Sequence, residues 1–131
     1  VALVQTEKGE LPHKTRYINV TDSIDVSDAP LKVGLHMYTL GFPLFNIVQD
    51  MKMDKGIQIT ACGGSITRAD NEYGFGFDAT SYHGASGSPI FNDKGMLIGV
   101  LNKGFDQAQG FNFGIKAKYV KELLNSPHKV K

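Results

Sequence analysis

The sequence predicts an all-β fold, an antiparallel sandwich or barrel followed by one short C-terminal helix. Apolar residues mostly alternate with polar ones or form short runs that end at glycine, proline or asparagine. Alternation at a period of two is typical of strands with one buried face, and many short strands separated by turn residues are typical of sandwiches and barrels. Apolar residues recur at helical spacing in one stretch near the C-terminus, which predicts the helix.

The strands are expected in chain order at residues 1–4, 16–20, 35–40, 56–66, 73–77, 89–91, 96–101 and 111–115. The segment 56–66 contains two adjacent glycines, which predict a bend in a long strand. The sequence Asn-Asp-Lys-Gly at 92–95 predicts the turn of a hairpin. The helix presents an apolar face, a packing feature that ends before Pro127 and consists of Tyr119, Val120, Leu123 and Leu124.

Length and composition indicate one ordinary globular unit and exclude several classes of function. The chain has 131 residues, of which 41% are hydrophobic and 21% charged, and its net charge is +1. This charge gives no reason to expect nucleic acid or an anionic membrane as a partner. A single cysteine excludes an internal disulfide and a zinc site of the paired-cysteine kind. No apolar run approaches the roughly 20 residues of a membrane span.

The segment 83–89, His-Gly-Ala-Ser-Gly-Ser-Pro, is the part of the sequence that points to chemistry. A serine nucleophile in acyl transfer must project from a tight turn, and nearby backbone N–H groups must point at the developing oxyanion. Glycine suits the positions where a Cβ would clash, and Gly84 and Gly87 flank Ser86 in this way. A plain Gly-Ser surface turn explains the short pattern equally well.

The flanking residues resemble the nucleophile region of the chymotrypsin superfamily. Residues 84–100 are similar to the bacterial branch that contains glutamyl endopeptidases and high-temperature-requirement proteases. Residues 111–124 resemble the last strand and C-terminal helix of that family, and 31–43 the stretch that opens its second barrel. Residues 1–4 are similar to the strand that directly follows the catalytic aspartate. The resemblance thus covers almost the whole chain, with the serine segment as its most specific part.

The resemblance implies the second barrel of a two-barrel serine endopeptidase. Residues 1–30 would be a remnant of the first barrel and the inter-barrel linker, and residues 31–131 the C-terminal barrel with its helix. The catalytic histidine and aspartate would lie upstream of Val1, on a first barrel that acts in cis or in trans. We therefore expect the 131-residue chain alone to be inactive. The resemblance also implies a polypeptide substrate, a secreted or periplasmic location, no cofactor and no metal.

When the family's site residues are matched to this sequence position by position, Ser86 resembles the nucleophile. The N–H groups of Gly84 and Ser86 resemble those of the oxyanion hole. Residues 101–104 resemble the strand that pairs with the substrate backbone by β-addition, namely Leu101, Asn102, Lys103 and Gly104. The residues that would line or approach the specificity pocket are Thr80, Ser81, Tyr82 and Leu101.

The chain departs from its relatives at three positions. Ala85 replaces the aspartate that trypsin-like enzymes pair with a new N-terminus, so that ion pair cannot form here. Leu101 stands where glutamyl endopeptidases place a histidine, which argues against a preference for acidic side chains. Thr80 lies at the base of the specificity pocket, where a preference for Arg or Lys would require aspartate.

Two alternatives to the endopeptidase remain. One is a non-catalytic relative that binds without cleaving; the other is a plain ligand-binding barrel, which leaves the serine segment unexplained. A histidine upstream and an aspartate just before Val1 would favour the enzyme over a non-catalytic relative. His83 is too close to Ser86 in the chain to serve as its base. Because a lone second barrel exposes apolar surface, we expect it to be covered by a homodimer, by exchange of the N-terminal segment or by a retained first-barrel fragment.

Overall fold

The computed structural model describes residues 13–14, 31–41, 59–69, 72–81, 84–105 and 108–125. The expected strands at 1–4 and 16–20, the linker, Tyr82 and His83 lie outside these residues. The elements are β1 (His36–Gly41), β2 (Thr60–Arg68), β3 (Gly74–Phe77), β4 (Pro89–Asn92), β5 (Leu97–Phe105), β6 (Ala108–Lys116) and α3 (Ala117–Asn125).

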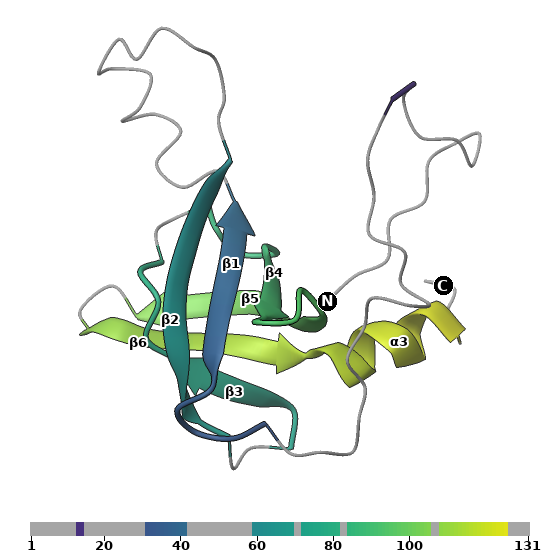
Figure 1. Ribbon diagram of the computed structural model, residues 1–131. Helices are drawn as coiled ribbons and strands as arrows, with labels where there is room; N and C mark the ends of the chain where they lie inside the picture. The colour runs from purple at the N-terminus through teal and green to yellow at the C-terminus, as the bar shows by residue number, and fades with distance from the viewer. Residues whose placement is uncertain are drawn as a thin grey trace, which may run out of the picture.

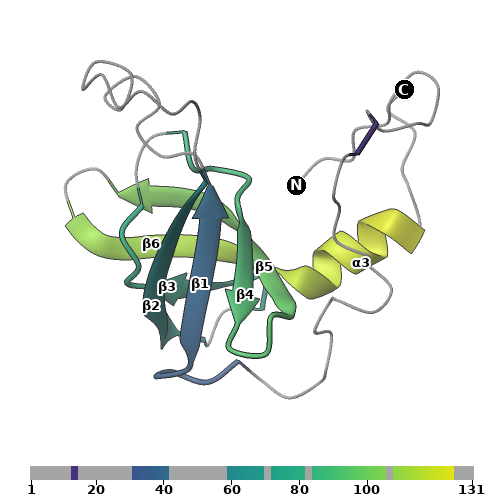
Figure 2. The ribbon, with the colours of Figure 1, turned by 45° about the horizontal axis from the view of Figure 1, so that its top comes forward.

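The described strands close into an antiparallel barrel in the order β1-β2-β3-β6-β5-β4, and β4 pairs with β1 to complete the ring. Figure 1 shows β1 and β2 side by side, with β5 and β6 crossing them. Figure 2 shows β4 next to β1, where the barrel closes. The predicted all-β barrel with a C-terminal helix is confirmed.

β1 shows the alternation that the sequence predicts. Met37 and Thr39 are buried in the barrel, whereas His36, Tyr38 and Leu40 are exposed. The antiparallel register with β2 places Thr39 opposite Cys62 and Tyr38 opposite Gly63. Residues that face one another across an antiparallel pair project on the same side of the sheet. Thr39 and Cys62 therefore share one side of the β1–β2 pair.

The hairpin between β4 and β5 is built around Asn92. The Asn92 side-chain oxygen accepts hydrogen bonds from the N–H groups of Lys94 (3.0 Å) and Met96 (2.9 Å). The Asn92 carbonyl accepts from Gly95 N–H at 3.0 Å, and the φ of Gly95 is 73°. An asparagine that bonds to the backbone a few residues ahead stabilises a turn locally. The predicted hairpin at 92–95 is thus confirmed.

A β-bulge in β5 lies at Ile98. Ile90 of β4 pairs with Gly99 and Phe91 pairs with Leu97, so Ile98 is the extra residue. Ile98 lies in the main core, while Leu97 packs on the other side of the strand. The main core consists of Met37, Ile66, Phe75, Phe77, Ala79, Ala85, Ile90, Ile98 and Leu101.

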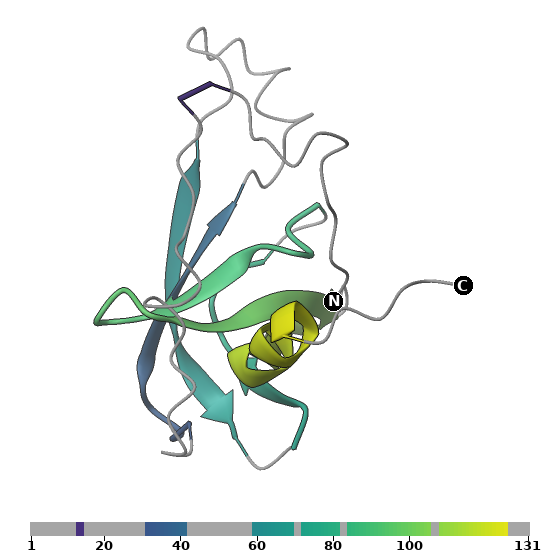
Figure 3. The same ribbon diagram turned by 90° about the vertical axis from the view of Figure 1, so that its right-hand side faces the viewer.

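α3 lies outside the barrel and packs against β5 and β6 (Figure 3). Its Ala117 is buried against Leu97, and Val120 packs on the same small cluster. The expected apolar face is present only in part, because Leu124 remains 38% exposed. None of the helices in the described part of the chain has the length and apolar content of a membrane span.

The tight interior of β5 predicts that Gly99→Ala destabilises the barrel. A Cβ at Gly99 would lie 2.6 Å from the Ile115 carbonyl oxygen and 2.6 Å from the Phe75 ring. Overpacking of this kind costs about 1–3 kcal/mol of unfolding free energy. Gly63→Ala is the matched control in an exposed part of β2, where the new Cβ would meet only the Tyr38 ring at 3.6 Å. We expect the control to change stability by less than about 0.5 kcal/mol in urea unfolding; equal losses in the two variants would contradict this packing.

Candidate active site

Ser86 projects from a tight four-residue turn between β3 and β4. The N–H of Ser88 donates to the Ala85 carbonyl at 3.0 Å, which closes the turn. Gly87 has a φ of 91°, as the third residue of a type II turn requires. Ala85 is buried in the core at 6% exposure, whereas Ser86 is exposed. The turn thus holds the Ser86 side chain in solvent while its neighbour anchors the backbone.

Two hydrogen bonds fasten this turn to β5, and both use Leu101. The N–H of Gly87 donates to the Leu101 carbonyl at 2.7 Å, and the N–H of Leu101 donates to the Ser88 carbonyl at 2.8 Å. The Leu101 side chain is 2% exposed and belongs to the main core. The position of Ser86 is therefore set by the barrel and not only by the local turn.

The N–H groups of Gly84 and Ser86 lie next to the serine hydroxyl in the chain. Within the described residues, neither N–H donates to a backbone carbonyl. Gly84 has a φ of 90°, and a Cβ added there would meet nothing within 4 Å, so this glycine lies in the open. Both donors are therefore free, within the described part of the chain, to meet a group from outside.

Beyond Leu101, β5 runs past the end of its partner β4. The pairing of β4 with β5 reaches Val100, whereas the pairing with β6 continues to Phe105. Asn102 is exposed, and Lys103 and Gly104 pair with Phe113 and Asn112 of β6. An edge with unpaired backbone groups can accept an additional strand. Residues 102–104 offer such an edge close to the serine turn.

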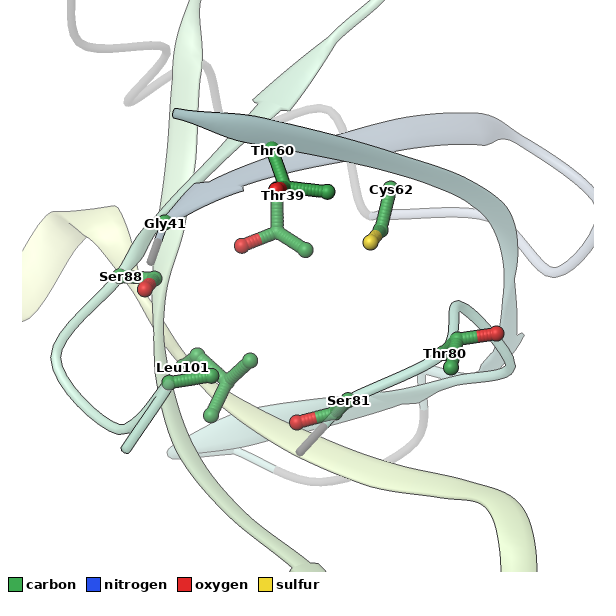
Figure 4. Close-up of a pocket in the computed structure, with 9 residues that line it drawn as sticks. Thr39, Gly41, Thr60, Cys62, Thr80, Ser81, Ser88 and Leu101 are labelled. Carbon is green, nitrogen blue, oxygen red and sulfur yellow. The ribbon is translucent and has the colours of Figure 1, made fainter. Parts of the chain in front are cut away.

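A small hollow lies behind the turn, between it and the β1–β2 pair. It has about 240 Å³ of empty space, which includes space open to solvent, and its enclosed part is about the size of a water molecule. Thr80, Ser81 and Leu101, all expected around a specificity pocket, line one side of it (Figure 4). The Thr80 side chain is exposed, and Figure 4 shows its hydroxyl pointing away from the hollow. β1 and β2 supply the opposite wall, with Thr39 and Cys62, which the sequence did not single out.

Two further polar residues hold the segment that leads from β3 toward the turn. The buried Asn112 of β6 donates through Nδ2 to the Ala79 carbonyl at 2.5 Å. Asp78 accepts through Oδ1 from the Ser65 N–H at 2.6 Å. Asn112 sits between Phe111 and Phe113, and this alternation would have placed the phenylalanines inside and Asn112 outside. Phe111 is instead 62% exposed and Asn112 is buried, so the local pattern could not have revealed it. These bonds join 78–79 to β6 and to β2.

The structure therefore brings together Ser86, Gly84, Thr80 and the 101–104 strand at one end of the barrel. His36 lies at the start of β1 and is exposed, and His83 is outside the described residues. In the described part of the chain, no group of three His, Cys, Asp or Glu side chains could hold a metal ion.

No family model matches this sequence, and no curated protein gives a significant match. Solved structures do match, with TM-scores near 0.6. They include an inactive serine-to-alanine mutant of Rv3671c from M. tuberculosis H37Rv (18% identity, TM-score 0.59, covering 82% of this chain and 56% of that one). The serine endoprotease from Yersinia pestis also matches, with 20% identity and a TM-score of 0.62, covering 78% of this chain and 33% of that one. The HtrA-type protease AlgW with a decapeptide matches with 25% identity and a TM-score of 0.61, covering 79% of this chain and 32% of that one.

The described chain has the fold of a trypsin-like serine protease barrel. It spans between about a third and just over half of the length of these proteases. In this trypsin-like barrel, the exposed serine lies on the loop that enters β4, and the terminal helix packs outside β5 and β6. The predicted relationship to the trypsin-like barrel is thereby confirmed at the level of the fold.

The turn geometry predicts that Gly87→Ala destabilises this trypsin-like barrel. An L-residue in the left-handed region costs about 1–2 kcal/mol relative to glycine. Space is not the reason, because nothing lies within 4 Å of a Cβ at Gly87. Ser86→Ala, one residue earlier and exposed, should change the unfolding free energy by less than about 0.5 kcal/mol. Thermal or urea unfolding of the two variants measures this, and an unchanged stability of Gly87→Ala would argue against the type II turn.

Proposed function

We propose that this chain is the nucleophile-bearing barrel of a serine endopeptidase. The observation that carries the proposal is the Ser86 turn: the hydroxyl is exposed, and its backbone is anchored on both sides by buried residues, Ala85 and Leu101. A nucleophile requires such anchoring, because its reacting oxygen must be held in position relative to the substrate carbonyl.

In this proposal, Ser86 Oγ attacks the scissile carbonyl carbon and an acyl-enzyme forms. The carbonyl oxygen becomes an oxyanion, which accepts hydrogen bonds from the N–H groups of Gly84 and Ser86. The absence of a backbone acceptor for either N–H among the described residues supports this role. A histidine takes the proton of Ser86 and passes it to the leaving amine, and water then hydrolyses the acyl-enzyme.

The substrate is proposed to be a polypeptide that adds a strand to the edge of β5. Among the described residues, 102–104 pair with β6 only, which supports this binding mode. Leu101 has a different role here, because both of its main-chain groups are bonded to the turn. It lines the wall near Thr80 and Ser81 with an apolar side chain. A neutral or apolar side chain is therefore the preferred substrate group beside the scissile bond.

The histidine and aspartate are proposed to come from a first barrel, in cis or in trans. The chain spans a third to about half of the proteases that it resembles. Among the described residues, the histidines are His13 and His36, and both are exposed. As for other proteases of this kind, a secreted or periplasmic location is part of the proposal.

The proposal predicts a large difference in reactivity between the chain alone and the chain with its first barrel. A serine without a base keeps an ordinary hydroxyl and is a poor nucleophile at pH 7. We expect a fluorophosphonate probe to modify the chain alone at least about a thousandfold more slowly than the assembled protein. Ser86→Ala should abolish modification of the assembled protein. Ser88→Ala, a serine in the same turn, is the matched control and should retain it.

The outcome also separates the endopeptidase from a non-catalytic binding module of the same fold. Rapid modification of Ser86 in the chain alone would contradict a base supplied by another barrel. An assembled protein that binds peptides but shows no reaction of Ser86 would overturn the enzyme and support the binding module.

A further inference from the structure

The hollow behind the serine turn contains a polar atom with no partner. Thr39 is 6% exposed, and within the described residues its Oγ1 is buried without a hydrogen bond. A buried hydroxyl without a partner costs free energy, because its hydrogen bonds to water have been lost and not replaced. Figure 4 shows the Thr39 side chain pointing into the hollow. The site therefore has an unused hydrogen-bonding group that a bound molecule could satisfy.

Cys62 lies opposite this hydroxyl in the strand register. Thr39 of β1 pairs with Cys62 of β2, and such facing side chains have their Cβ atoms about 4.5–5.5 Å apart. Cys62 is a free, half-buried thiol, and Figure 4 shows its sulfur pointing into the same hollow. It is also the one cysteine of the sequence, so no second thiol of the same chain competes for it.

We infer that Cys62 is a modification site that forms a mixed disulfide with a small thiol carrying a hydroxyl group. The incoming molecule is a small disulfide, RSSR. The Cys62 thiolate attacks one sulfur, the S–S bond of RSSR breaks, and a new S–S bond joins Cys62 Sγ to one RS group. The other half leaves as a thiolate and takes up the proton lost by Cys62. Cys62 is oxidised, RSSR is reduced, and RSH is the product.

The unpartnered Thr39 hydroxyl and the small space beside it select the group. The enclosed part of the hollow is about the size of a water molecule and the rest is open to solvent, so a two-carbon tail with a terminal hydroxyl enters it more readily than a peptide-sized adduct. From Cys62 Sγ, this tail points toward Thr39 Oγ1, which can donate to it or accept from it. Ala85 and Ser88 form the wall on the side of the turn. The adduct therefore lies directly behind the backbone that carries Ser86.

The test compares two groups of the same size. The 131-residue chain is equilibrated with 2-mercaptoethanol and its disulfide, and separately with 1-propanethiol and its disulfide. The fraction of Cys62 in each mixed disulfide is measured by mass spectrometry of the Cys62 peptide. The same equilibria on the urea-unfolded chain supply the intrinsic preference. The folded chain should favour the hydroxyethyl adduct by about three- to tenfold over this reference, as one additional hydrogen bond implies.

Two variants of Thr39 identify the source of the preference. Thr39→Val replaces the hydroxyl by a methyl group of similar size and should reduce the ratio to that of the unfolded chain. Thr39→Ser keeps the hydroxyl and should retain the preference, and far-UV circular dichroism checks that both variants fold. The proposal is overturned if folded Cys62 forms neither adduct. It is also overturned if the two adducts form in the unfolded-chain ratio, or if Thr39→Val leaves the preference intact.

Discussion

The pair of hydrogen bonds between Leu101 and the serine turn is the interaction on which the candidate site depends. Leu101 contributes its side chain to the barrel core and both main-chain groups to the turn. Because one residue serves both purposes, the packing of the barrel interior determines where the Ser86 backbone lies. The edge of β5 beyond the β4 pairing begins at the next residue, so the Ser86 turn and this edge are positioned by the same strand.

Closure of the barrel positions β4 and β5 so that the hydrogen bonds between Leu101 and the serine turn can form. β4 must pair with β1 on one side and with β5 on the other, and the bulge at Ile98 adjusts the second pairing. The turn enters β4 directly, so its register against β5 follows from this adjustment. Closure also encloses Thr39 beside Cys62, and the described residues supply no hydrogen-bond partner for the threonine hydroxyl. The structural core and the hollow behind the serine are thus two results of one arrangement.

Local patterns predicted the elements whose information is local. The alternation in β1, the Asn92 turn, β3 and the terminal helix lie within a residue or two of their expected positions. β5 and β6 are longer than their apolar runs suggested. Their additional residues, such as Asn102 and Gln109, are polar, and these ends are strands because they pair with each other across the hairpin. A period-two pattern of apolar residues contains no information about such an extension.

The sequence by itself determined the class of fold, the turn chemistry around Ser86 and the resemblance to a protease barrel. Each of these depends on residue types at short spacing: glycines beside a serine, alternating strands, an asparagine before a turn. Only the tertiary structure decided that Leu101 anchors the turn, that Asn112 bonds to Ala79 and that Thr39 faces Cys62. It also decided that the Thr39 hydroxyl is buried with no hydrogen-bond partner in the part of the chain that the structure describes. Asn112 and Ala79 are 33 residues apart in the chain. Such contacts depend on strand register and on the closure of the barrel, which no local spacing of residue types specifies.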